Sequence, residues 1–220
     1  MIWIVMIAVM VLSMIVQARL KNRFEKYSEV PTGLSGAEVA QRMLQAHGIH
    51  DVNIVSIEGT LTDHYNPQTK TVNLSHDVYY GRNVAAAAVA AHECGHVVQH
   101  AVGYAPLKLR TAMVPVLTFT NSWISWVLLA GLILYQAFPS LLWIGIAMFG
   151  LSTLFSFVTL PVEMNASARA VQWLDNAGVV TYDTKPMAQD ALKWAAYTYV
   201  IAAIGSLATL LYYISVARRR

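Results

Sequence analysis

Three residues in the pattern HExxH have types and spacing suited to catalysis: His92, Glu93 and His96. They lie in the alanine-rich run 84–98, whose composition favours a helix. At about 100° per residue, their side chains fall at about 0°, 100° and 40° and share one face, whereas Cys94, at about 200°, points away. The pattern is typical of zinc hydrolases, in which two imidazoles bind the metal and a carboxylate takes a proton from zinc-bound water.

The residues around the motif decide between a metal site and an exposed, charged turn of helix. Residues 85–91, Val97 and Val98 are small or apolar, so the helix is predicted to be buried. Buried histidine and glutamate side chains need a partner that offsets the cost of leaving water. A zinc ion is such a partner, and the sequence predicts one Zn2+ per chain.

The composition places these residues in a membrane protein. Of 220 residues, 56% are hydrophobic and only 12% are charged. Pro139 and Ser140 divide one long apolar stretch, so residues 112–160 are predicted to form a transmembrane hairpin. Four segments have the roughly 20 apolar residues that a span requires: 1–18, 112–137, 141–160 and 194–216.

Basic residues predict the orientation of the chain. The first segment has no basic residue before its apolar run and no small-residue cleavage site after it, so we expect an uncleaved anchor. The basic residues that follow place 19–111 in the cytoplasm, and the hairpin returns 161–193 to the same side. The basic tail 217–220 then lies outside, against the rule, unless the last segment is re-entrant. These flanks favour a lipid bilayer as partner, and no basic patch with interleaved aromatic residues suggests nucleic acid.

A soluble part with a small β-sheet must position the motif, so the fold class is mostly α with a minor β component. Ser35 and Glu38 form a capping box for a helix that runs to about His47, with Gly48 as its C-cap. The next segments predict a β-hairpin just before the metal helix. They are strands at 52–57, 61–65 and 71–74, with a turn at 66–70.

The outer strand of that hairpin has two interpretations. A free edge lets a peptide substrate add as a further strand, through main-chain hydrogen bonds that ignore sequence. Alternatively, the sheet is short and capped and has no role with substrate. We favour the substrate role, because a peptide must be aligned above the metal. The residues of this edge are Leu61, Thr62, Asp63, His64 and Tyr65.

A third metal ligand is missing from the motif, because a catalytic zinc usually has three protein ligands and keeps a fourth position for water. Glu163 is the strongest candidate, since it follows the third span on a helix expected to resume at 161 and to end before Gly178. The alternative for Glu163 is an ion pair with Arg169 at the membrane boundary. The other candidates are acidic residues near a membrane exit and His47, His50, His64, His76 and His100.

Several other polar side chains have alternative roles. His64 can reach the oxyanion that forms when water attacks a peptide carbonyl, or can hydrogen-bond to Asp63 and stabilise the hairpin. His100 shares the face of the motif but lies about 6 Å from His96 along the helix axis, which favours a supporting or structural role. Three tyrosines near the membrane boundary are either proton donors to the oxyanion or interfacial anchors. They are Tyr104, Tyr197 and Tyr199.

Four separate strings resemble the YugP-type neutral zinc metallopeptidases of bacterial membranes, in matching order over nearly the whole chain. They are LTDHYNP at 61–67, AAHECGHVVQHA at 90–101, GYAPL at 103–107 and TLPVEMNAS at 159–167. More distantly, a metal helix, a membrane hairpin and a Glu-bearing helix resemble the HtpX and Ste24 membrane peptidases. The resemblance implies an integral membrane gluzincin with His92, His96 and Glu163 as zinc ligands and Glu93 as general base.

Two residues depart from these families. Asn66 stands where the DHYDP string has aspartate, and asparagine serves much as aspartate does in a turn. Ser167 stands where the HtpX-like helix usually carries aspartate. The second departure puts in doubt which partner orients a zinc histidine.

The sequence thus predicts a zinc metalloendopeptidase of the bacterial plasma membrane whose catalytic part faces the cytoplasm. Its expected substrates are peptides or proteins, such as membrane or misfolded proteins. One alternative is a zinc hydrolase of a non-peptide bond such as a lipid amide, and another is a zinc-dependent membrane scaffold. Glu93 speaks against the scaffold, because a structural zinc site needs no base. The sequence does not indicate the oligomeric state.

Overall fold

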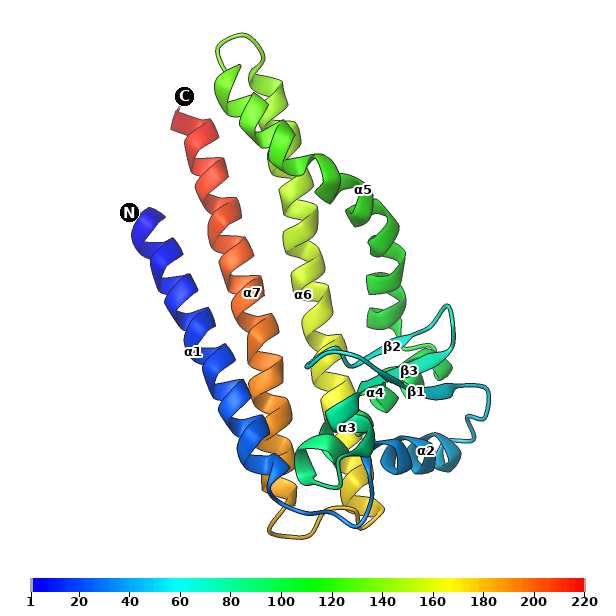
Figure 1. Cartoon of the computed structure of the whole chain (residues 1–220). Coiled ribbons are helices and arrows are strands. Elements are labelled where there is room, and N and C mark those ends of the chain that lie inside the picture. Colours follow the sequence, from blue (N-terminus) through cyan, green and yellow to red (C-terminus); the bar gives the residue numbers. More distant parts are fainter. Residues whose placement is uncertain (1, 220) are drawn as a thin grey trace.

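The computed structural model describes residues 2–219 and consists of four long helices with smaller elements gathered at one end (Figure 1). The long helices are α1 (Ile2–Ser28), α5 (Ala105–Ile133), α6 (Pro139–Asn176) and α7 (Lys185–Arg219). Along the bundle, α1 packs against α7, α7 against α6, and α6 against α5. Both ends of the chain and the α5–α6 turn lie away from the smaller elements.

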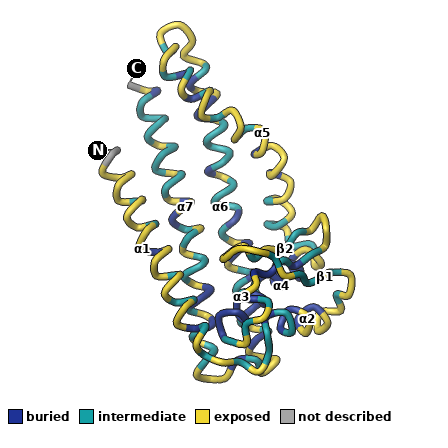
Figure 2. The backbone as a smooth tube through the Cα atoms, viewed as in Figure 1, coloured by how far each residue is buried: buried dark blue, intermediate teal, exposed yellow. Residues whose placement is uncertain are grey.

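The surface of the bundle is apolar. Large side chains such as Ile7, Phe119 and Trp126 are exposed along it, and Figure 2 shows that buried residues concentrate instead at the end that holds the smaller elements. Within the described residues, these four helices are long and apolar enough to cross a membrane. The predictions of a mostly helical chain with a small sheet and of four candidate spans are confirmed. Pro139 and Ser140, predicted to divide the two middle spans, are instead the first residues of α6, and the turn precedes them.

Two expectations about helix continuity are wrong. We expected a new helix at 161 to carry Glu163, but α6 passes through Pro161 without a break, so the membrane helix itself carries this residue. A proline removes one backbone hydrogen bond, and neighbouring helices can hold the helix together across it; α6 packs against α4, α5 and α7. The re-entrant alternative for the last segment also fails, because α7 is one helix up to Arg219; Arg220 lies outside the described residues.

The smaller elements begin with α2 (Gly36–Ala46), and here the sequence prediction is confirmed. Both hydrogen bonds of the capping box form between Ser35 and Glu38. The helix ends at Ala46 with His47 as its C-cap, one residue before the predicted cap at Gly48. Gly48 has φ of +67°, the left-handed conformation that suits a glycine after a helix. The helices that follow the sheet are α3 (His76–Tyr80) and α4 (Val84–Ala101).

The sheet has three strands in the order β1-β3-β2, with β1 (Asn53–Ile57), β2 (His64–Asn66) and β3 (Thr71–Ser75). The predicted hairpin is present, because β2 pairs with β3 in antiparallel orientation. β1 pairs with β3 in parallel, and the sequence did not indicate this pairing. β2 is an edge strand, as expected.

The predicted edge strand, 61–65, starts three residues too early and ends one residue too early. Leu61, Thr62 and Asp63 are irregular, and Leu61 has φ of +59° just after Gly59 at +103°. The Asp63 carboxylate accepts hydrogen bonds from the backbone N–H of Ser75 at 2.7 Å and from its hydroxyl at 3.1 Å. This carboxylate therefore ties the start of the hairpin to the end of β3.

Helix α4 lies at the centre of the smaller elements and is almost wholly buried. It packs against α2, α3, β3 and α6, and the alanines at 85–88, 90 and 91 allow these elements to approach closely. Cys94 is fully buried and points toward α2, where its sulfur lies 3.7 Å from the carbonyl oxygen of Ala40. The side chains of the two histidines and the glutamate of the motif lie on the other side of α4, which faces α6.

Candidate metal centre

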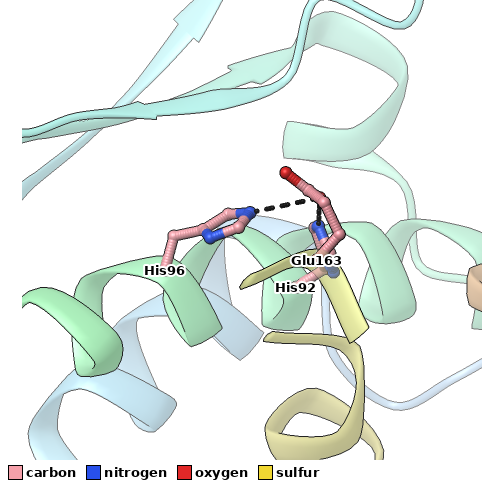
Figure 3. Close-up of side chains that lie close together, drawn as sticks. All are labelled: His92, His96 and Glu163. Carbon is pink, nitrogen blue, oxygen red and sulfur yellow. Dashed lines mark hydrogen bonds and ion pairs between the residues drawn. The ribbon is translucent and has the colours of Figure 1, made fainter. Parts of the chain in front are cut away.

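The two histidines of the motif meet Glu163 where α4 crosses α6 (Figure 3). Oε2 of Glu163 lies 3.3 Å from Nε2 of His92 and 3.6 Å from Nε2 of His96. One donor atom from each of the three residues lies within 4.8 Å of the other two. Among the described residues, this is the group that can hold a metal ion. The cluster therefore joins two helices, and His92 and Glu163 are 71 residues apart in the chain.

The donor types and spacing fit zinc. A tetrahedral zinc ion with ligands at about 2 Å has neighbouring donor atoms about 3.3 Å apart. The measured separations of 3.3 Å and 3.6 Å match this edge length closely. Two imidazole nitrogens and one carboxylate oxygen are also the donor set of many catalytic zinc sites.

The orientation of His96 is fixed by a buried amide. Nδ1 of His96 lies 3.1 Å from Oε1 of Gln99, whose Nε2 donates to the carbonyl of Val162 at 2.8 Å and to Oδ1 of Asn165 at 3.0 Å. Because both amide hydrogens of Gln99 are used there, its oxygen must accept the hydrogen of His96 Nδ1. The lone pair of His96 then lies on Nε2, facing the cluster.

The second histidine has a hydroxyl as its partner. The Oγ of Ser167 lies 3.1 Å from Nδ1 of His92, so this serine occupies the place where an aspartate was expected to orient a zinc ligand. Ser167 therefore contacts the zinc-ligand candidate His92 through a neutral hydroxyl, where an aspartate would present a charged carboxylate.

The ion pair considered between Glu163 and Arg169 does not form. Arg169 instead donates from Nε to Oδ1 of Asn165 at 2.7 Å, and so supports the amide chain behind His96. The cation near Glu163 is Arg110 of α5, with Nη1 3.8 Å from Oε1. No spacing in the sequence indicates Arg110, because it lies on a different helix from Glu163.

Glu93 is held beside the cluster by the edge strand. Its side chain is buried, with the residue 8% exposed, and its Oε2 accepts the backbone N–H of Tyr65 at 3.1 Å. Since β2 pairs with β3 on its other side, this bond shows that the free edge of β2 faces the motif. Among the described residues no lysine or arginine forms an ion pair with Glu93, so its carboxylate can remain available as a base.

The electrostatics of the cluster favour a cation. Burial alone would lower the pKa of His96, but the hydrogen bond to Glu163 and the negative charge of Glu93 outweigh it and raise the pKa. The site therefore attracts positive charge, as a proton or as a metal ion.

Gly95 explains how close the two helices come, and sequence reasoning missed its role. A Cβ added to Gly95 would lie 2.7 Å from the carbonyl oxygen of Ala166 and 3.1 Å from its Cα. No side chain fits at this crossing, which sets the distance between the histidines on α4 and Glu163 on α6. In the sequence, this contact is indicated by a glycine inside an otherwise alanine-rich helix.

Two cavities open on the cluster and share the side chains of His92, Glu93, Glu163 and Tyr199. The larger, of about 460 Å3, lies between β2, α4 and α5 and includes His64, His100 and Arg110 in its walls. The smaller, of about 140 Å3, lies between α1, α4 and α7. Substrate groups thus have space on two sides of the candidate metal site.

The other candidate histidines fall into two groups, those that line the larger cavity and those that lie away from it. His64 and His100 line the larger cavity, but His64 contacts the carbonyl of Thr62 at 2.8 Å rather than Asp63, and Nδ1 of His100 lies 3.4 Å from the hydroxyl of Tyr65. The other three histidines lie outside both the cluster and the larger cavity: His47 contacts the carbonyl of Met43, His76 packs against Tyr80, and His50 is exposed.

Of the three tyrosines, Tyr199 is the one beside the cluster. It lines both cavities and interacts with the carboxylates of Glu93 and Glu163. Tyr197 instead lies under the ammonium of Lys193, 5.7 Å from the ring centre, and Tyr104 is the N-cap of α5.

Comparison with known proteins agrees with the donor set. The model of a family described as "Putative neutral zinc metallopeptidase" matches residues 2–218. The chain belongs to this family. A relative, "Putative membrane protease YugP" of Bacillus subtilis, is 41% identical over 212 residues, which cover 96% of this chain and 93% of the relative. No solved structure matches the chain.

Membership confirms the resemblance carried by the four strings. The family name implies zinc, and the cluster of His92, His96 and Glu163 can bind a metal ion. The relative's name and the four apolar helices both point to a membrane protein. A zinc metallopeptidase associated with a membrane is the function class that these observations support.

Proposed function

We propose that this member of the neutral zinc metallopeptidase family is a gluzincin-like endopeptidase that hydrolyses peptide bonds at one zinc ion per chain. His92, His96 and Glu163 would hold the ion, and Glu93 would be the general base. The observation that carries the proposal is the arrangement around Glu93. Its carboxylate, which pairs with no lysine or arginine among the described residues, lies beside a cluster of three metal-donor atoms that opens into a cavity. A scaffold protein would have no use for this carboxylate.

The chemistry divides between the ion and the chain. When bound, zinc supplies a Lewis acid that makes water acidic and polarises a carbonyl. Glu93 takes the proton of the attacking water and passes it to the leaving amine. Ser167 and Gln99 keep the two imidazoles oriented, each through Nδ1.

Tyr199 is our candidate for stabilising the oxyanion. Its side chain interacts with the carboxylates of Glu93 and Glu163 and lines both cavities, so it stands where a carbonyl oxygen would gain negative charge. A phenol donates a hydrogen bond to such an oxygen without itself being ionised. His64 and His100 line the larger cavity and are placed to contact substrate there.

The free edge of β2 is our candidate for aligning the substrate backbone. It consists of His64, Tyr65 and Asn66, and the N–H of Tyr65 reaches Glu93. A peptide that lies along this edge would pass through the larger cavity and across the cluster. The irregular residues 61–63 would border the peptide rather than pair with it.

We further propose that the enzyme lies in the bacterial plasma membrane with its smaller elements in the cytoplasm. Basic residues in the last part of α1 and in the first turns of α5 support this orientation. Substrates would then be membrane proteins or misfolded chains that present extended backbone at the cytoplasmic face.

The test uses the full-length protein in detergent. Glu93→Gln should retain zinc by elemental analysis and lose cleavage of casein, and Glu163→Ala should lower the zinc content. If Glu93→Gln cleaves casein as fast as the unmodified protein, the base assignment is wrong. Unchanged zinc in Glu163→Ala would remove Glu163 from the ligand set, and cleavage of a labelled lipid amide but no peptide would favour the other hydrolase.

A further inference from the structure

The smaller cavity beside the cluster has a lining unlike that of the larger one. Apart from the metal-site groups and the polar side chains of Asp63, Ser167 and Tyr199, its walls are apolar side chains drawn from α1, α4, α7 and the segment before β2. They include Leu20, Phe24, Leu61, Val89, Ala195 and Ala196. The larger cavity instead includes two histidines and an arginine. The two sides of the site therefore suit different substrate groups.

Apart from Glu93 and Tyr199, which are assigned to the reaction, the polar groups that line the smaller cavity already have partners. Asp63 accepts two hydrogen bonds from Ser75, and Ser167 contacts His92. Glu163 is bound to the histidines. A polar group buried there would find no free partner and would lose its hydration, whereas an apolar group loses nothing.

The size of the cavity sets the size of the group. Its volume is about 140 Å3, and a dry protein cavity of about 150 Å3 lined by Leu, Ile and Phe admits a benzene molecule. The space thus accommodates one large aliphatic or aromatic side chain, and not a folded segment.

We propose that this cavity is a specificity pocket for one large apolar side chain next to the bond that is cleaved. The proposal rests on the peptidase function proposed above. Because the pocket is lined by His92 and Glu163 of the cluster and by Glu93, the side chain inside it belongs to a residue that flanks the scissile bond. The substrate class is therefore extended chain with a residue such as Leu, Phe or Met at that position.

Small residues on α7 keep the pocket open. Ala195 lines it, and a larger side chain at this position would occupy the space that the substrate needs. Ala202 provides a matched control, since it lies seven residues further along α7 and lines a separate groove between α1 and α7. The same substitution, alanine to leucine, can thus be made inside and outside the pocket.

The experiment measures cleavage of peptides that differ only in the residues flanking the cleaved bond: Leu, Phe, Ala or Asp. The full-length protein should have kcat/KM at least about tenfold higher for Leu or Phe than for Ala on one side of the bond, and lower still for Asp. Ala195→Leu should abolish this preference by slowing the Leu and Phe peptides, with zinc content unchanged. Ala202→Leu should keep it.

Binding to the inactive Glu93→Gln variant separates the pocket from the chemistry. Leu and Phe peptides should bind this variant at least about tenfold more tightly than the Ala peptide, and adding Ala195→Leu should remove the difference. Equal cleavage and equal binding of the Leu, Ala and Asp peptides would overturn the pocket and leave the peptidase function intact. Preferential binding of the Leu peptide without cleavage by the unmodified protein would support the pocket and refute the peptidase function.

Discussion

Gly95→Ala tests whether the α4–α6 crossing builds the metal site. The added Cβ would lie 2.7 Å from the Ala166 carbonyl oxygen, whereas ordinary contacts begin at 3.4 Å, so the helices must separate by about 0.7 Å. The obstacle is backbone, which no change of rotamer can move. Glu163 lies within one turn of Ala166 and must move with it. Zinc ligand distances tolerate only about 0.2 Å.

The expected effect on zinc is larger than the effect on stability. Overpacking costs about 1–3 kcal/mol, and alanine in a helix regains about 0.5–1 kcal/mol over glycine, so the free energy of unfolding should fall by about 2.5 kcal/mol at most. Zinc affinity should fall about 10- to 100-fold, as when the support of a ligand is lost. Competition with a chromogenic chelator measures the affinity, and thermal unfolding measures the stability.

Gly150→Ala, on α6, is the matched control for a glycine-to-alanine change within a helix. Its Cβ would meet Leu210 at 3.9 Å, an ordinary contact. This variant should bind zinc like the unmodified protein and unfold at an equal or slightly higher temperature. If Gly95→Ala also binds zinc with unchanged affinity, the crossing does not set the ligand geometry and the reasoning is refuted.

Three further predictions concern single side chains. Tyr199→Phe should lower kcat about 100-fold or more with zinc content retained, as expected for loss of an oxyanion donor, while Tyr197→Phe should not; equal rates in steady-state assays would exclude Tyr199. Gln99→Leu should weaken zinc binding about 10- to 100-fold, because His96 loses the acceptor for Nδ1, and chelator competition would detect it. Cys94 should resist alkylation until the protein unfolds, because burial raises the pKa of its thiol; mass spectrometry of native protein treated with iodoacetamide checks this.

Local signals in the sequence were sufficient for much of the fold. The capping box at Ser35 and the turn that starts at Asn66 depend on neighbours in the chain, so their residue types predict them. The HExxH pattern predicted one shared helix face, and the structure brings His92 and His96 together there. Long apolar runs likewise predict spans, because the bilayer sets their length.

Contacts between distant segments were harder to predict. Pro161 signalled a break, yet packing against neighbouring helices outweighs the lost hydrogen bond and α6 continues. The approach of Arg110 to Glu163 depends on how α5 leaves α4, and no spacing encodes it. Gly95 and Leu61 were missed for the same reason, since a close crossing and a left-handed bend have meaning only in three dimensions.

The continuity of α6 links the membrane to the metal. At 1.5 Å per residue, Glu163 lies about 36 Å from the start of the helix at Pro139. A tilt of one degree about that far end would displace the carboxylate by about 0.6 Å, several times what a zinc ligand tolerates. Helix tilt responds to the thickness of the surrounding bilayer. We therefore expect zinc affinity to depend on the acyl length of the surrounding lipid. An affinity measured in detergent micelles applies to that environment alone.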